Sequence, residues 1–172
     1  MLIKQLRWIP IAAIAATAVF ARGAAAQESG IPVGSLAPSA KVQTLDGRPF
    51  DISSYIGKSP MLLEFWAFWC PNCKELEPSL IALEKKYRSR MRFVAIAVSA
   101  SETRDRVKNF TSKRGYQHET LYDAAGAATE AYDVPATSYV VILDKSGKVA
   151  YTGLGGKQNL EPAILKVLAP TQ

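Results

Sequence analysis

Cys70 and Cys73 are the only cysteines in the 172-residue chain, and two residues separate them in the stretch FWAFWCPNCKELEP. Thiols at this spacing can trade electrons by forming and breaking a disulfide, can hold a metal ion, or can fill space as small apolar side chains. Because the two are so close in sequence, a disulfide between them cannot cross-link distant parts of a fold. A purely structural disulfide is therefore not expected.

The elements around the pair favour redox chemistry. A compact apolar run, 61–67, predicts a buried strand directly before it, and the apolar spacing over 70–88 predicts a helix directly after it. Backbone N–H groups at a helix N-terminus favour a thiolate and lower a thiol's pKa. Pro71 suits the first helical turn, and the three-residue step returns Cys73 to the face of Cys70. We expect Cys70 to be the open, attacking thiol and Cys73 to resolve the mixed disulfide.

Two more residues near the pair have types that need an explanation. Glu64 places a carboxylate inside the apolar run, where charged side chains are seldom buried without a partner or a purpose. Either Glu64 has a role in the chemistry, or it lies at an edge of the sheet and reaches water. Trp69, beside Cys70, is expected to line a face on which partner proteins dock, since exposed aromatic side chains are common in such surfaces.

The rest of the chain alternates between strand and helix patterns. Residues 27–60 are predicted to form a loose arm that ends in a small hairpin turning at Asp46-Gly47. Further strands are predicted at 91–99, 120–122, 139–143 and 149–154, and further helices at 103–114, 124–132 and 160–168. This order predicts an α/β fold, a three-layer sandwich with a mixed central sheet flanked by helices and an N-terminal hairpin extension.

The first 26 residues have the composition of a secretory signal peptide, which leaves 27–172 as one domain. Lys4 and Arg7 precede an apolar stretch of 14 residues, 8–21, followed by Ala24-Ala25-Ala26. As a helix that stretch spans about 21 Å, less than the roughly 30 Å hydrocarbon core of a membrane, which favours cleavage over an uncleaved membrane tether. Without Lys4, Arg7 and Arg22 of this segment, the chain keeps 18 Lys and Arg against 15 Asp and Glu, a net charge of +3. Because that charge is small, no nucleic-acid partner is expected.

The stretches LLEFWAFWCPNC, YDVPATSYVVILDKSG and VGSLAP make the chain, from about Val33 to Leu168, similar to the exported TlpA-like and ResA-like thiol-disulfide oxidoreductases of the thioredoxin superfamily. The resemblance implies a thioredoxin fold, a periplasmic or otherwise exported location, and electron exchange with protein thiols and disulfides without a cofactor. It also implies a reductive direction, as in cytochrome c maturation or the reduction of copper-site thiols, with electrons from a membrane thiol-disulfide carrier. The residues themselves do not determine the direction.

The resemblance also implies site residues. In thioredoxins an acidic residue matching Glu64 lies beneath the cysteines and assists proton transfer, which makes Glu64 the expected proton acceptor of Cys73. The superfamily further has a cis-proline loop facing the cysteines. Counting nine residues back from Gly147, that place holds Ser138, preceded by Thr137.

Pro135 is the alternative for the cis-proline position, but it stands three residues too early and would lengthen the following strand. We favour Ser138, and expect a trans bond before it, since a non-proline cis bond costs about 2.5–4 kcal/mol. Thr137 and Ser138 are therefore predicted, with Trp69 and Pro71, to line the substrate-docking surface. TlpA-like proteins also commonly have a glutamate where this chain has Leu76, and whether either flanking residue, Glu75 or Glu77, replaces it is left open.

Two other functions compete with disulfide exchange. A metal-binding module would use the Cys-x-x-Cys pair as half of a zinc or copper site, but the only histidine, His118, is expected to be a surface residue, so no metal site is predicted. A peroxiredoxin-like peroxidase would need a proline and a threonine or serine where this chain has Leu63 and Ala67. Peroxide reduction is therefore not expected.

Overall fold

The computed structural model describes residues 30–114 and 117–170, so the predicted leader, 1–26, lies outside the described residues. The described part contains one seven-stranded sheet, in the spatial order β2-β1-β5-β4-β3-β6-β7. The strands are β1 (Lys41–Thr44), β2 (Pro49–Asp51), β3 (Met61–Trp66), β4 (Arg92–Val98), β5 (Glu119–Asp123), β6 (Tyr139–Leu143) and β7 (Val149–Leu154). The helices are α1 (Pro71–Tyr87), α2 (Arg104–Arg114), α3 (Ala127–Ala131) and α4 (Glu161–Leu168), with a short 3₁₀ turn, η1 (Ile52–Ser54).

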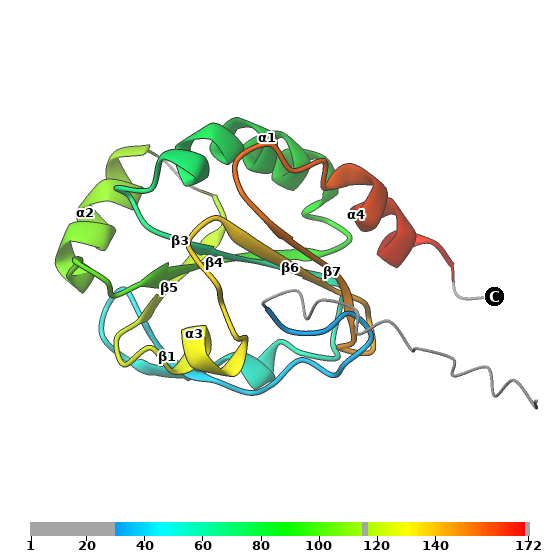
Figure 1. Cartoon of the computed structure of the whole chain (residues 1–172), viewed down its shortest axis with the longest axis horizontal. Helices are drawn as coiled ribbons and strands as arrows, with labels where there is room; N and C mark the ends of the chain where they lie inside the picture. Colours follow the sequence, from blue (N-terminus) through cyan, green and yellow to red (C-terminus); the bar gives the residue numbers. More distant parts are fainter. Residues whose placement is uncertain (1–29, 115–116, 171–172) are drawn as a thin grey trace, which may run out of the picture.

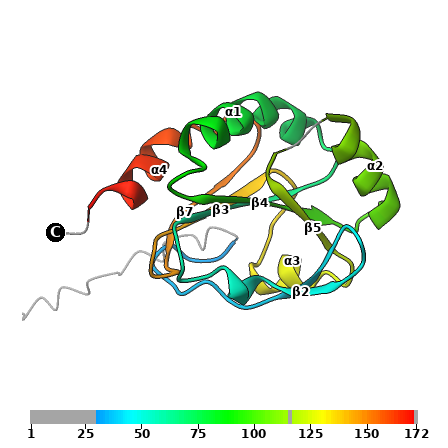
Figure 2. The same cartoon turned by 180° about the vertical axis from the view of Figure 1, so that it is seen from behind.

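The central strands are parallel and the outer ones antiparallel. β3 pairs with β4 and β4 with β5 in parallel, whereas β6, β7 and the β1–β2 hairpin are joined antiparallel. In Figures 1 and 2, α1 and α4 cover one face of the sheet and α3 the other, while α2 lies beyond α1 on the same side. Because both parallel connections step in the same direction across the sheet, right-handed crossovers place α1 and α2 on one face. The predicted mixed three-layer α/β architecture is confirmed.

β3 is the strand that positions the cysteines, and its sequence explains its central place. All six of its residues are buried, as a strand covered on both faces requires. Leu62 packs with apolar residues of α1 and α4, whereas Leu63 and Phe65 pack on the other side with Tyr132, which caps α3. The chain leaves β3 between these two apolar clusters, and four residues separate its end from the start of α1.

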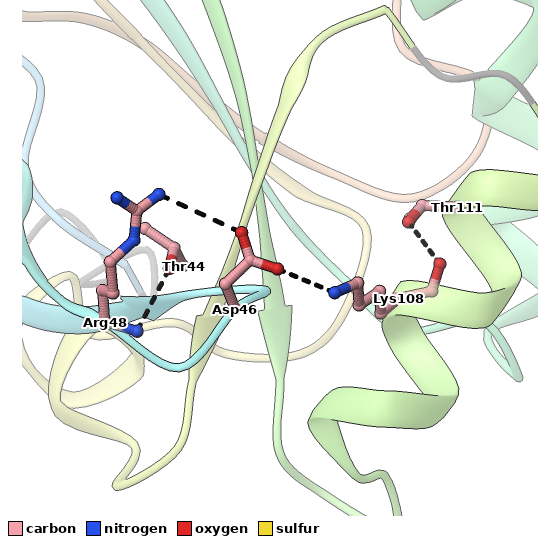
Figure 3. A network of polar contacts seen from close by, with 5 residues as sticks. All are labelled: Thr44, Asp46, Arg48, Lys108 and Thr111. Atoms are coloured by element: carbon pink, nitrogen blue, oxygen red, sulfur yellow. Dashed lines mark hydrogen bonds and ion pairs between the residues drawn. The ribbon is translucent and has the colours of Figure 1, made fainter.

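The β1–β2 hairpin extends the sheet at the edge of β5 and contacts α2 through its turn. Lys108 Nζ lies 2.7 Å from Asp46 Oδ1, and the Arg48 guanidinium lies 4.0 Å from the other carboxylate oxygen (Figure 3). Within the turn the Arg48 N–H donates to Thr44 Oγ1, and within α2 the Thr111 hydroxyl donates to the Lys108 carbonyl (Figure 3). Exposed pairs of this kind contribute about 0–1 kcal/mol, so they fix the turn's place more than they stabilise the fold.

The loose arm predicted for 27–60 is wrong for residues 30–40, whereas the hairpin predicted to end it, turning at Asp46-Gly47, is confirmed by the pairing of β1 with β2. The N–H groups of Gly34 and Ala37 donate to the carbonyls of Val149 and Gly147, and Val149 N–H donates back to Ser35. The arm therefore covers the start of β7, whose edge would otherwise expose unpaired backbone groups. The sequence pattern missed this contact because a Gly- and Pro-rich stretch bonded to a strand edge has no periodicity of its own.

The other predicted elements lie within a few residues of the observed ones, and 139–143 and 149–154 agree at both ends. The α1 helix continues through Pro78, whose missing N–H removes one bond from its ladder. Among 30–114 and 117–170, none of the helices has the length and apolar character needed to cross a membrane.

Candidate active site

The two cysteines lie at the start of α1, which begins at Pro71. Cys70 is the N-cap residue of the helix, with extended backbone angles (φ −73°, ψ 118°), and its Sγ accepts a hydrogen bond from the Cys73 N–H at 3.1 Å. Both thiols are free. A backbone N–H aimed at a sulfur, at the positive end of a helix dipole, favours negative charge there. The three-residue spacing of the pair thus directs the backbone of the second cysteine at the sulfur of the first.

Burial of the pair differs from expectation. Cys70 was predicted to present an open surface, but it is only 3% exposed, and Cys73 is 6% exposed. The reason is the loop before the helix. The Cys70 N–H donates to the Ala67 carbonyl, which turns the chain tightly, and the sulfur then folds back over the first turn of α1. The neighbouring Trp69 and Pro71 are exposed, as predicted for residues on a docking face.

Glu64 lies in the middle of the sheet. It pairs with Ala95 of β4 on one side and Val140 of β6 on the other, and it is 8% exposed, so the alternative of an edge position is excluded. It lines a cavity of about 20 Å³ together with Cys73, and a space of that size has room for one water molecule. Burial, with a smaller contribution from the charge of Glu77, raises the pKa of Glu64 to about 8.

The Cys73 thiol is also hard to ionise. Burial is the largest cause that raises its pKa, the hydrogen bond with Cys70 adds to it, and the nearby charge of Glu64 acts in the same direction. Cys73 and Glu64 therefore form a buried pair in which only one group can comfortably carry a negative charge. Their titrations belong to the pair and not to either residue alone.

Of the two glutamates left open by the sequence, Glu77 is the one that reaches this cavity. Its side chain lines the space beside Glu64 and Cys73, and both of its carboxylate oxygens accept from Arg114 at the end of α2, at 2.9 and 2.7 Å. Glu75 instead points toward Lys157, 3.7 Å away. Leu76, between them, is fully buried in the core.

The sequence interpretation missed a residue that holds the loop before Cys70. The Glu102 carboxylate accepts a hydrogen bond from the Phe68 N–H at 2.8 Å, and the Trp69 indole N–H donates to the Ala100 carbonyl at 3.0 Å. Glu102 is buried, and burial raises its pKa against the opposing effect of the Phe68 N–H. No local pattern marks Glu102, because it lies in the turn between β4 and α2, about thirty residues after the loop that it holds.

The loop before β6 has the shape expected if Ser138 replaces the proline. β6 begins at Tyr139, directly after Ser138, and no peptide bond among 30–114 and 117–170 is cis. Ser138 has a left-handed backbone (φ 68°), and its N–H donates to the Phe65 carbonyl at 2.8 Å, a bond that a proline could not make.

Ser138 is further fixed by Gln158, whose amide donates to the carbonyls of Ser138 and Gly155 at 3.0 and 2.7 Å. Thr137 is half-buried and Pro135 is exposed. The hydrogen bond from the Ser138 N–H to the Phe65 carbonyl places this loop beside the end of β3. Cys70 follows the last residue of that strand by four positions.

His118 is not the surface residue that the sequence predicted. Its side chain is 10% exposed, and its Nδ1 lies 3.2 Å from Glu84 Oε2 of α1, whose side chain is 8% exposed. The helix periodicity could have indicated Glu84, which stands on the buried face of α1 with Leu80 and Leu83. Among the described residues no three His, Cys, Asp or Glu side chains gather in a way that could hold a metal ion.

Comparison with known proteins agrees with this geometry. The redoxin family model matches residues 32–168. The thiol-disulfide oxidoreductase ResA of Bacillus cereus is 29% identical over 148 residues, which cover 85% of this chain and 84% of that protein. The crystal structure of a putative thiol:disulfide interchange protein DsbE from Chlorobium tepidum matches with a TM-score of 0.71 and 25% identity, over 81% of this chain and 99% of that one.

A secreted disulfide oxidoreductase of Mycobacterium tuberculosis, described as homologous to the Escherichia coli DsbE protein, is 29% identical with a TM-score of 0.62, over 74% of this chain and 92% of that one. The matches span nearly the whole described domain and include the strand, the Cys-x-x-Cys pair and the helix that positions it. The chain belongs to the redoxin family, and it has the thioredoxin-like fold and cysteine pair of a thiol-disulfide oxidoreductase.

Proposed function

We propose that this protein exchanges electrons with protein cysteines through Cys70 and Cys73, working as a reductase of substrate disulfides. The single observation that supports this most is the Cys73 N–H directed at Cys70 Sγ at 3.1 Å, at the N-terminus of a 17-residue helix. That contact lowers the energy of a sulfur that carries negative charge, which is the form that attacks a disulfide.

The exchange proceeds in two steps whose electrons balance. The Cys70 thiolate attacks one sulfur of the substrate disulfide, which forms a mixed disulfide and releases one substrate thiolate. Cys73 then loses its proton and attacks Cys70 Sγ, so that a Cys70–Cys73 disulfide forms and the second substrate thiol leaves. The substrate gains two electrons and the protein loses them, and a further dithiol must reduce the protein again.

Glu64 is the proposed proton acceptor in the second step. Cys73 is buried and its pKa is raised, so it needs a base close by. Glu64 lines the same cavity, so the proton can pass to it directly or through one water molecule. Its raised pKa suits this role, because a base is most effective when its pKa lies near the working pH. In the reverse reaction the protonated Glu64 would return the proton to Cys73.

Partner proteins are proposed to dock across the exposed Trp69 and Pro71 and the loop at Thr137 and Ser138. Because Cys70 is only 3% exposed, a substrate disulfide must come into close contact with this surface to reach the sulfur. Residues 1–26 are proposed to export the chain, which then is either periplasmic or tethered to the membrane by an uncleaved leader. The secreted disulfide oxidoreductase of Mycobacterium tuberculosis supports export. The TlpA-like and ResA-like resemblance suggests cytochrome c maturation or copper-site thiols as the substrate class, and a membrane thiol-disulfide carrier as the electron donor.

The roles of the two cysteines are tested by single substitutions. We expect Cys70→Ser to abolish disulfide exchange, because the only other thiol, Cys73, is buried and its pKa is raised. We expect Cys73→Ser to form mixed disulfides that cannot resolve, which mass spectrometry of non-reduced samples would detect as covalent adducts with a model substrate peptide. If Cys73→Ser were inert and Cys70→Ser formed the adducts, the two roles would be exchanged.

The direction of the reaction is tested by the reduction potential, measured by equilibration with glutathione. We expect a value closer to that of thioredoxin, about −270 mV, than to that of the strong oxidant DsbA, about −120 mV. A value near −120 mV would identify an oxidant of folding proteins and overturn the reductase proposal. Because 30 mV equals about 1.4 kcal/mol for this couple, the measurement separates the two cases easily.

The role of Glu64 is tested by Glu64→Gln. Resolution of the mixed disulfide should slow about tenfold or more, and the inflection near pH 8, above which the wild-type carboxylate can accept a proton, should disappear from the rate profile. Stability gives a second signal. The Glu64 pKa is raised above its ordinary value of 4.5, so the stability that protonation contributes is complete below pH 4.5 and is lost as the pH rises through about 8.

Urea titrations at several pH values should show that decline in wild type and a flatter profile in Glu64→Gln. A variant with the wild-type rate profile would remove Glu64 from the mechanism, whatever the stability measurements gave.

The role of Glu102 is tested with two variants that differ in hydrogen bonding. Glu102→Ala leaves the buried Phe68 N–H without a partner, so we expect a loss of about 1–3 kcal/mol of unfolding free energy and faster alkylation of Cys70 by iodoacetamide as the loop loosens. Glu102→Gln keeps an acceptor oxygen and should alkylate near the wild-type rate. Equal alkylation rates for Glu102→Ala and wild type would show that the carboxylate does not hold the loop.

A further inference from the structure

His118 and Glu84 form a buried pair that the proposed mechanism does not use. The imidazole Nδ1 and the carboxylate Oε2 are 3.2 Å apart, and both side chains are at least nine-tenths covered. Buried ionisable groups are costly, so a pair of them next to a reaction site needs an explanation. Glu84 lies on α1 and His118 just before β5, so the pair joins the helix that carries the cysteines to the sheet.

The imidazole lies between Glu64 and the protein surface. His118 lines the cavity shared by Glu64 and Cys73, and it also lines a second void of about 10 Å³ that Glu64 borders. On another side it lines an open cleft of about 430 Å³ at the end of α1, together with Glu84 and Arg88. One side chain therefore borders both the buried carboxyl group and solvent.

A path for protons is needed at this place. Each turnover in the proposed reaction removes a proton from Cys73, and Glu64, which receives it, is 8% exposed. The cavity beside it has room for about one water molecule. Between α1 and α2 that cavity is lined by Phe68, Ile81 and Phe110, whose apolar side chains do not carry protons. Lys74 and Glu77 also line it, and Arg114 engages both carboxylate oxygens of Glu77.

We propose that His118, held by Glu84, is the proton relay through which Glu64 exchanges its proton with solvent. This inference rests on the proposed function and adds to it a positioning pair that neither the cysteine motif nor the fold indicates. An imidazole suits the task because one ring nitrogen can keep its hydrogen bond while the other accepts or releases a proton.

The proton balance of the relay is simple. The Cys73 proton moves to Glu64 as the Cys73 thiolate attacks Cys70 Sγ, and the same proton then passes to His118 and from it to water in the cleft. The substrate thiolate that leaves takes up a proton from solvent, so the net charge of the site is restored after each turnover.

Several charged groups face the imidazole and set its environment. Those that line the three spaces around His118 come from every element packed against it: Glu64 of β3; Cys73, Lys74, Glu77 and Glu84 of α1; Arg88 and Arg90 of the turn after it; Arg92 of β4; and Glu119 of β5. Glu77 is paired with Arg114, and Arg92 lies 3.8 Å from Glu119. Glu84 is the carboxyl group in direct contact with the ring, and Glu64 borders two of the same spaces.

The relay is tested by His118→Gln, with Arg88→Gln as the matched control from the same cleft. We expect His118→Gln to slow resolution of the mixed disulfide about tenfold in dilute buffer, with the reduction potential unchanged, because a relay alters rates and not equilibria. Added imidazole should restore the rate in His118→Gln and leave wild type and Arg88→Gln unaffected. A purely structural loss would not respond to imidazole, and that result would overturn the relay.

A second variant tests whether protons instead reach Glu64 through the opening of the cavity lined by Phe68, Ile81 and Phe110. Ile81→Trp enlarges a half-exposed side chain at that opening without touching His118. If Ile81→Trp slowed resolution and His118→Gln did not, protons would enter through that opening and the relay would be wrong. We expect the opposite pattern.

A measurement without substrate separates the relay from the proposed function. Because His118 is the only histidine, one imidazole resonance in the NMR spectrum of the reduced protein reports on it. We expect the chemical shift of that resonance to change near pH 8, where Glu64 titrates, and this change to be absent in Glu64→Gln. Absence of this coupling in wild type overturns the relay even if the cysteines exchange electrons. An inactive wild type with the coupling present would instead overturn the proposed function and leave the proton connection standing.

Discussion

One hydrogen bond, from the Cys73 N–H to Cys70 Sγ, is the interaction on which the rest of the site depends. It exists because Cys70 is the N-cap of α1, so its sulfur takes the place that a serine or aspartate oxygen occupies at other helix starts. That position requires a helix directly after the cysteine and a tight turn directly before it. β3, buried on both faces, provides the fixed point from which the turn departs.

Around this bond, carboxyl groups control the site from three directions. Glu102 holds the loop before Cys70 through the Phe68 N–H, Glu64 lies beneath Cys73, and Glu84 holds His118 at the back of the same region. All three are buried, and burial raises the pKa of Glu64 and of Glu102.

Much of this could be predicted from the sequence, and the failures have a common cause. The strand at 61–66, the helix that follows it, the hairpin at 139–154 and the exposure of Trp69 all follow from local periodicity and neighbours in the chain. The exposure of Cys70, the loose arm and the surface position of His118 were predicted wrongly, because each depends on groups far away in the sequence. The Ser138 loop is an intermediate case, since the count of residues located it but its bond to Phe65 required the sheet.

The sequence alone therefore determined that a redox-capable pair of thiols stands between a buried strand and a helix, because the spacing of two cysteines and the periodicity of their neighbours are local properties. Only the tertiary structure decided which charged groups line the cavity beside that pair or contact the residues that line it. Glu64, Glu102, Glu84 and His118 come from four separate parts of the chain, and their burial and mutual contacts arise from how β3, β4, α1 and β5 pack. Electrostatic effects on a thiol depend on distance and dielectric, and neither quantity exists until the chain has folded.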